Sequence, residues 1–153
     1  MEKHEQIGQA REAFARLMDA IEGMDEQALT TPGIDVWSVR EILAHIAGWT
    51  LVDTGIMRRL ARGERPLPEG EEYGTGDSRN RGYAAGAASK SAATIVGELR
   101  VAFDEFVTAA ESVPEDRFAE GRTAHRVMQE SVWQHLREHS AEIETYRATL
   151  VGA

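Results

Sequence analysis

The chain has 153 residues, of which 42% are hydrophobic; this is enough apolar material for the core of one domain, and it excludes wholesale disorder. The 26 acidic against 17 basic residues give a formal net charge of -9 at pH 7, and because this charge repels phosphate groups we expect no nucleic-acid partner and no binding to an anionic membrane. The chain contains no cysteine, so disulfides, zinc–thiolate sites, iron–sulfur clusters and a cysteine nucleophile are excluded.

The start of the chain and its hydropathy predict a cytoplasmic protein. The first residues read Met-Glu-Lys-His-Glu-Gln and lack the apolar run of a signal peptide. No stretch approaches the roughly 18 consecutive apolar residues that cross a bilayer. We therefore expect residues 1–153 to form a single cytoplasmic domain.

Two helices are predicted in the first half of the chain. Apolar residues recur at helical spacing in a first stripe that consists of Ile7, Ala10, Phe14, Leu17, Met18 and Ile21. Gly23 is the expected end of this helix, and residues 24–37 are rich in turn formers. Ser38 and Glu41 then have the spacing of a capping box directly before a second apolar run, whose expected end is Gly63.

The second half of the chain contains a long connection followed by two more predicted helices. Residues 63–86 are rich in glycine and proline; such a segment is often functional or crosses between the ends of a fold, and a flexible linker is the alternative. Residues 91–113 and 123–150 each carry an apolar stripe at helical spacing, and no stretch alternates with the period of a strand. Four amphipathic helices predict an all-α fold, an antiparallel four-helix bundle.

Three histidines have the positions of metal ligands. His135 and His139 are four residues apart, so both project from the apolar face of the last predicted helix. Neutral imidazoles at this spacing can bind one divalent ion, although two partly buried histidines that bond to their neighbours give the same pattern. His45 lies one turn after the capping box, among core positions. Three inward histidines on two helices match the three-ligand set of a catalytic metal site with open positions.

The segments that contain these histidines resemble the motifs of a known family. Residues 37–49, Trp-Ser-Val-Arg-Glu-Ile-Leu-Ala-His-Ile-Ala-Gly-Trp, are similar to the second-helix motif of the DinB-like (YfiT-like) superfamily, and His135-x-x-x-His139 followed by Glu142 resembles its last-helix motif. The resemblance implies a four-helix bundle with a long crossover after the second helix, often as a dimer. It also implies a divalent ion, nickel or zinc in many members, held by three histidines, for which His45, His135 and His139 are the matching positions.

Further residues are weaker candidates for the site. Glu41 could orient a ring nitrogen of His45, although the capping box alone explains a glutamate at this position. Trp49 and Trp133 could form the walls of a pocket, but large aromatics at helical spacing also fill cores. Asp53 could act as an acid, a base or a fourth ligand, or it could be a solvated carboxylate. In the crossover, Asn80 resembles an asparagine of a DinB subgroup related to colibactin self-protection proteins.

Two classes of function are compatible with these features. The first is a metal-dependent transferase or hydrolase that acts on a small electrophilic molecule, because the superfamily includes transferases that use low-molecular-weight thiols. The second is a non-catalytic stress-response or binding protein that has a structural metal or sequesters a small molecule. A structural site would be closed by a fourth protein ligand, whereas an enzyme needs an exchangeable position at the metal.

Overall fold

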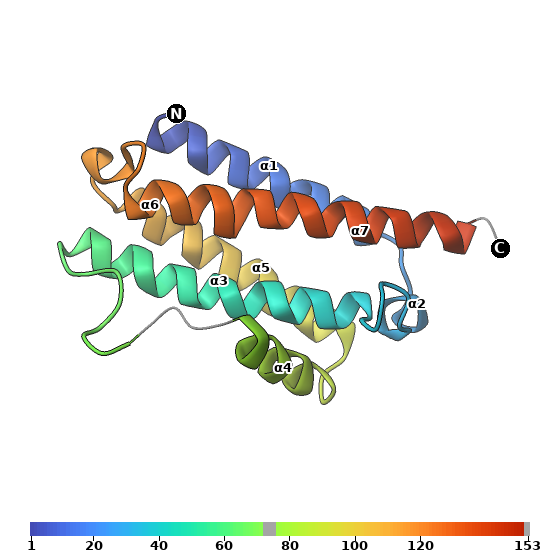
Figure 1. Cartoon of the computed structure of the whole chain (residues 1–153). Helices are drawn as coiled ribbons and strands as arrows, with labels where there is room; N and C mark the ends of the chain where they lie inside the picture. Colours follow the sequence, from blue (N-terminus) through green and yellow to red (C-terminus); the bar gives the residue numbers. More distant parts are fainter. Residues whose placement is uncertain (72–75, 152–153) are drawn as a thin grey trace.

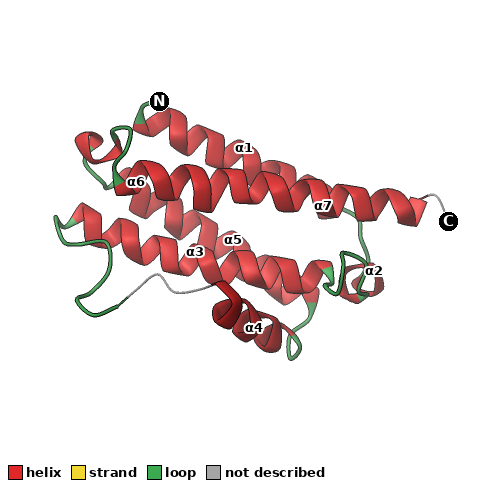
Figure 2. Ribbon diagram, in the orientation of Figure 1, coloured by secondary structure: helices red, strands yellow, loops and turns green. Residues whose placement is uncertain are grey.

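Helices account for the regular secondary structure of the described chain (Figure 2). The structure, a computed structural model, describes residues 1–71 and 76–151, and it describes side chains throughout these ranges except at 76–81 and 151. Within them the feature closest to a strand is an isolated bridge between Ile34 and Trp37. The prediction of an all-α fold is confirmed.

The body of the molecule consists of long helices joined by shorter helical segments. The long helices are α1 (Lys3–Ile21), α3 (Val39–Ala61), α5 (Ala92–Glu111) and α7 (Gln134–Val151). The shorter segments are α2 (Glu26–Thr30), α4 (Gly76–Ala87), the 3-10 helix η1 (Glu115–Phe118), α6 (Thr123–Arg126) and the π-helix η2 (Val127–Trp133). The stretch predicted to be rich in turns contains α2, and the predicted long crossover contains α4, where the sequence indicates a short helical piece near residues 80–88.

The long helices form two pairs of parallel neighbours (Figure 1). The start of α1 meets the segment before α7, because Trp133 Nε1 donates to Gln6 Oε1 at 2.8 Å. The starts of α3 and α5 also meet, because Arg40 donates to the Lys90 carbonyl at 3.2 Å. The two pairs run in opposite directions, and the start of α1 is hydrogen-bonded to the end of α5. The prediction of an antiparallel bundle is therefore wrong for these two pairs. The crossover returns the chain to the end of the bundle where α3 begins, so α5 runs parallel to α3.

The core is formed by the apolar stripes of the long helices and by close contacts at small residues. The rings of Phe14 on α1 and Phe103 on α5 stack with their centroids 4.1 Å apart, which adds to the gain from burying them. Gly48 on α3 faces the ring of Tyr83 on α4, and a Cβ atom at this position would overlap that ring. A glycine in α3 therefore lets α4 lie directly against it.

The capping box predicted at the start of α3 is present. Ser38 Oγ accepts a hydrogen bond from the Glu41 backbone N–H at 3.2 Å, and the Glu41 carboxylate accepts one from the Ser38 N–H at 3.1 Å. These two bonds satisfy donors that a helix start otherwise leaves without partners. Because Ser38 is 1% exposed, water cannot easily replace its hydroxyl.

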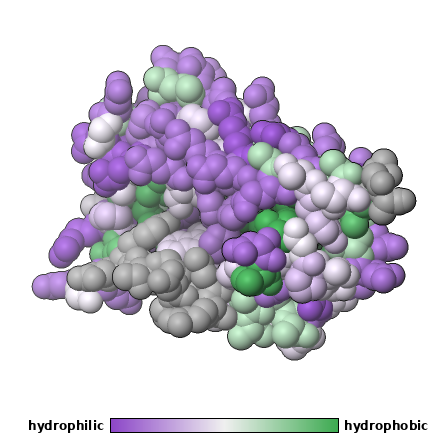
Figure 3. Space-filling model, turned by 45° about the vertical axis from the view of Figure 1, so that its right-hand side comes forward, coloured by the Kyte–Doolittle hydropathy of each residue, from purple (hydrophilic) through white to green (hydrophobic). Residues whose placement is uncertain are grey.

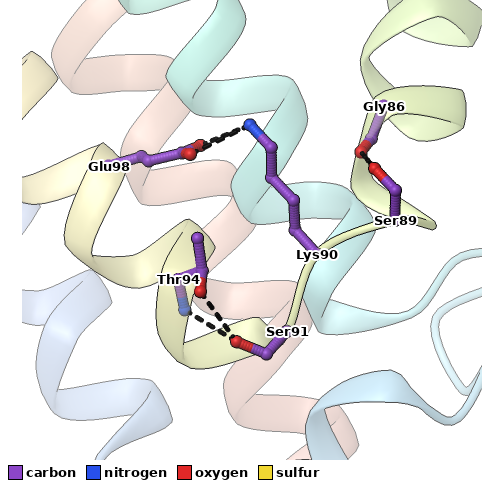
Figure 4. Close-up of polar contacts among 6 residues, drawn as sticks. All are labelled: Gly86, Ser89, Lys90, Ser91, Thr94 and Glu98. Atoms are coloured by element: carbon purple, nitrogen blue, oxygen red, sulfur yellow. Dashed lines mark hydrogen bonds and ion pairs between the residues drawn. The ribbon is translucent and has the colours of Figure 1, made fainter.

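The turn that leads from α4 into α5 is held by polar contacts (Figure 4). Ser91 is the N-cap of α5, and its hydroxyl accepts a hydrogen bond from the Thr94 N–H at 3.1 Å. Lys90 Nζ lies 2.9 Å from the Glu98 carboxylate. Both contacts are exposed, so they fix the direction in which α5 starts more than they stabilise the fold.

The last long helix begins with a π-helical segment that the sequence did not predict. The apolar residues Met128, Val132 and Leu136 follow one another at steps of four, which is wider than the 3.6 residues of an α-helical turn. A π-helical turn accommodates the wider step, and such turns often occur at functional sites. Here η2 ends two residues before His135.

The surface is mainly hydrophilic on the face that Figure 3 shows, with small hydrophobic patches between polar side chains. The large hydrophobic side chains exposed on the described surface are Met1, Val36, Leu51, Val101 and Leu150. In the part of the chain that the structure describes, no helix is long and apolar enough to cross a membrane.

The capping box gives a stability prediction. Ser38→Ala removes a buried acceptor at the start of α3 and should lower the free energy of unfolding by about 1–2 kcal/mol. Ser89→Ala is a suitable control, because its exposed hydroxyl donates to the Gly86 carbonyl and it caps none of the long helices. Urea denaturation followed by circular dichroism measures both variants, and equal stabilities would contradict the role given to Ser38.

Candidate metal centre

Three imidazole rings from two helices converge in the interior of the bundle. His45 comes from α3 and is 8% exposed, while His135 and His139 come from successive turns of α7. His135 Nε2 lies 3.0 Å from His45 Nε2 and 2.9 Å from His139 Nε2. We call these residues the three-histidine cluster. No carboxylate oxygen of the described residues lies within 4.8 Å of the ligand nitrogens of all three histidines at once.

Buried hydrogen bonds hold the segment before the two α7 histidines against the other helices. Trp133 is tied to α1 through Gln6, as described above. Ser131 donates to the carboxylate of Asp53 on α3 at 2.8 Å, and Asp53 is 1% exposed. Because such buried bonds are costly to break, the register of α7 against α1 and α3 is fixed where His135 enters the cluster.

The two α7 histidines have acceptors at their outer ring nitrogens. His139 Nδ1 lies 2.7 Å from Glu142 Oε1, within ion-pair distance although outside hydrogen-bond geometry. The ring of His135 is hydrogen-bonded to the backbone of Ser131, and Nδ1 makes this bond because Nε2 faces the cluster. An acceptor beside Nδ1 favours the tautomer with its proton there. With both Nδ1 atoms protonated, the two Nε2 atoms, 2.9 Å apart, would present lone pairs to each other, and a cation between them would stabilise that arrangement.

The environment keeps His135 and His139 uncharged at neutral pH. Burial, and then repulsion from His139, lower the pKa of His135 to about 4, against a smaller opposing effect of its backbone hydrogen bond. Burial, and then repulsion from His45, lower the pKa of His139 to about 4, against the opposing charge of Glu138. Metal ions bind neutral imidazole, so these two ligands need not lose a proton at neutral pH.

A cavity of about 280 Å³ opens beside the cluster. Its lining consists of Ile34, Asp35, Trp37, Ile42, His45, His139 and Glu142. The Trp37 ring lies edge-on to the His45 ring, with centroids 6.4 Å apart. The lining thus combines apolar side chains, two imidazoles and two carboxylates, and the cavity can hold a small molecule next to the cluster.

The other predicted site residues lie around the cluster rather than in it. The Glu41 carboxylate is engaged in the capping box. Trp49 lies edge-on to Tyr83 of α4, with ring centroids 6.2 Å apart, and Trp133 bonds to α1. Asp53 contacts Ser131 instead of completing the ligand set. The side chain of Asn80 lies outside the described residues.

Among the residues that line the cavity, the two carboxylates and the tryptophan are not assigned to a pocket by the sequence pattern. Glu142 stands three residues after His139, a spacing that places both on one helix face and could have identified it. Trp37 belongs to the quoted motif but was not assigned to the pocket. No sequence pattern predicts that Asp35 lies beside the cavity, because its position depends on how the turn before α3 folds.

Comparison with known proteins identifies the family of this chain. The model of the DinB superfamily matches residues 6–143. The chain belongs to the DinB superfamily. The resemblance recognised in the helix motifs is confirmed. Among curated proteins, the comparison found no match.

Solved structures share the fold at low sequence identity. The colibactin self-resistance protein ClbS, solved in complex with a dsDNA, is 16% identical with a TM-score of 0.77, and the match covers 95% of each chain. The sibling lethal factor precursor DfsB is 18% identical with a TM-score of 0.81 over 98% of this chain and 97% of that one. An uncharacterised protein from Escherichia coli UTI89 is 14% identical with a TM-score of 0.82 over 97% and 94%.

The complex of ClbS with dsDNA overturns one expectation from the sequence. We excluded nucleic-acid partners because of the net charge of -9, and this exclusion is wrong. Net charge is a sum over the whole surface, whereas phosphate contacts depend on where basic side chains gather. In this chain arginines gather at one end of the bundle, where Arg65, Arg117 and Arg122 line one groove.

The lowered histidine pKa values predict how the stability of the metal-free protein depends on pH. Both values are about 4 in the folded chain, against about 6.5 when unfolded. Between these values the unfolded chain binds more protons, so the free energy of unfolding should decrease as pH falls from about 6.5 to about 4. Urea denaturation across this range measures the slope. The double variant His135→Asn, His139→Asn should have a smaller slope, and an equal slope would contradict the assignment.

Proposed function

We propose that the chain, as a single domain over residues 1–153 and as a homodimer, is a metal-dependent transferase or hydrolase of small electrophilic molecules. In this proposal the three-histidine cluster holds one divalent ion of the nickel or zinc class. The observation that carries the proposal is the convergence of the Nε2 atoms of His45, His135 and His139, with His135 Nε2 3.0 Å and 2.9 Å from the other two. Nickel and zinc both accept imidazole ligands.

The spacing of the ring nitrogens fits such an ion. Nitrogens bound at about 2.1 Å stand about 3.0 Å apart at adjacent corners of an octahedron and about 3.4 Å apart at those of a tetrahedron. The separations to His135 Nε2 are 3.0 Å and 2.9 Å. Both separations are close to the spacing of nitrogens that share one ion.

The chemistry follows from the donor set and from the cavity. When bound, an ion with neutral ligands supplies positive charge that lowers the pKa of a thiol or water and so provides a nucleophile near neutral pH. The chain has no cysteine, so a thiol would come from a low-molecular-weight cosubstrate. Trp37 and Ile42 give the cavity apolar walls that exclude water from the electrophile. Glu142 favours the His139 tautomer whose Nε2 lone pair faces the cluster.

A non-catalytic protein with a structural metal is the alternative reading. Structural zinc sites are closed by four protein ligands. In the described part of the chain the cluster has three, and a cavity lies beside it. Both features support an open site, and therefore the enzyme.

Metal content tests the proposed ligand set. Protein purified without chelator should carry close to one nickel- or zinc-class ion per chain by elemental analysis. His45→Ala should lose most of it, because an i,i+4 pair on one helix remains. The helical circular dichroism signal should persist, since the apolar core does not need the ion. His4→Ala, whose side chain is 75% exposed, should retain the metal. Full metal content in His45→Ala would contradict the assignment.

We propose DNA contact as a second candidate function, because a basic groove lies at one end of the bundle. The groove has a volume of about 270 Å³, and its charged lining consists of Arg65, Arg117, Arg122 and Glu64. Nearby Arg59 and Arg62 are paired with a glutamate, which reduces their contribution. Arginines that face one groove can contact successive phosphates. The ClbS complex with dsDNA supports this candidate, because it shows that a protein of this fold can bind duplex DNA.

The basic groove gives a binding prediction. The triple variant Arg65→Gln, Arg117→Gln, Arg122→Gln should weaken the binding of a labelled DNA duplex by at least about tenfold in fluorescence anisotropy at low salt. The slope of affinity against salt should fall by about one for each phosphate that no longer meets an arginine. Arg11→Gln, which removes a cation paired with Glu111, is the matched control. Wild-type protein that does not bind the duplex would exclude this candidate.

A further inference from the structure

The cavity beside the three-histidine cluster has a one-sided charge. Asp35 and Glu142 supply carboxylates to its lining, and no lysine or arginine of the described residues lines it. Glu138 adds a further negative charge that acts on His139. A concave site with charge of one sign raises the local concentration of ligands with the opposite charge.

The backbone places Asp35 in a conformation that favours glycine. Its φ is 56°, and it is the only non-glycine residue of the described chain with a positive φ. The turn around it is closed by two hydrogen bonds, Ile34 N–H to the Trp37 carbonyl and Trp37 N–H to the Ile34 carbonyl, each 3.0 Å. Glycine would adopt this φ without strain, whereas aspartate tolerates it less well and adds a charge. The turn therefore has an aspartate, instead of the glycine that this φ favours, at a position that lines the cavity.

Glu142 is brought to the lining of the cavity by α7. One of its oxygens lies 2.7 Å from His139 Nδ1, and its side chain is 45% exposed. The carboxylate therefore contacts the cluster and also faces the space where a ligand would lie. Asp35 and Glu142 come from segments far apart in the sequence and meet at this one cavity.

We propose that the small molecule taken by this cavity carries a positively charged nitrogen on a short arm beside its metal-binding atom. This inference rests on the proposed function, because the cluster is taken to hold the ligand's other end. The cationic group would be attracted by the Asp35 and Glu142 carboxylates of the lining, and an anionic group in the cavity would be repelled by both. Exposed carboxylates usually only face solvent. The following test distinguishes that reading from the binding of a cationic ligand.

Three short thiols that differ in charge test the inference. Protein loaded with cobalt(II) is titrated with cysteamine, 2-mercaptoethanol and 3-mercaptopropionate, and the thiolate-to-cobalt absorption band reports binding. Because the thiols also differ in acidity, the informative quantity is how a variant changes the ratio of their affinities. Asp35→Asn removes the charge while asparagine keeps the left-handed conformation. Asp116→Asn, an exposed position of η1, is the control.

The variant should act on the charged thiols in opposite directions. Asp35→Asn should weaken cysteamine about 3- to 10-fold, strengthen 3-mercaptopropionate, and leave 2-mercaptoethanol within about twofold. Asp116→Asn should leave all three ratios unchanged. If cobalt binds and Asp35→Asn leaves the ratios as in the wild type, the inference is overturned while the proposed function stands. If the wild-type protein takes up no cobalt, the proposed function is overturned and this inference with it.

Discussion

The placement of protons on two histidines is the constraint on which the site depends. The His135 ring bonds to the backbone of Ser131, and the Glu142 carboxylate lies 2.7 Å from His139 Nδ1. With both outer nitrogens protonated, the lone pairs of the inner nitrogens, 2.9 Å apart, would face each other. Two acceptors at this distance repel each other unless a proton or a metal ion lies between them. Burial lowers both pKa values to about 4, which makes an extra proton unfavourable at neutral pH and favours a metal ion.

The rest of the fold keeps the three rings together. The crossover that contains α4 returns the chain so that α3 and α5 run parallel, and α1 and α7 form the opposing pair. The segment before His135 is then fixed from two sides, through Trp133 to α1 and through Ser131 to Asp53 of α3. A π-helical turn lies in this segment, and such turns often occur at functional sites.

The sequence predicted the features that depend on local pattern. The capping box fixed the start of α3 and hence the position of His45 within it, and the four-residue spacing placed His135 and His139 on one face. Features that depend on tertiary arrangement were not predictable in this way. They include the parallel pairing of helices, and the Asp35 turn beside the cavity, which has no periodic signal. The exclusion of nucleic acid failed because a summed charge contains no information about where arginines lie.

Anomalous diffraction from crystals of nickel-loaded protein, recorded at the nickel absorption edge, tests the central claim most directly. The account predicts one strong peak per chain among the Nε2 atoms of His45, His135 and His139, about 2.1 Å from each nitrogen. It also predicts that the remaining positions around the peak face the cavity lined by Trp37. A peak elsewhere on the chain, or crystals that take up nickel without density at the cluster, would contradict it.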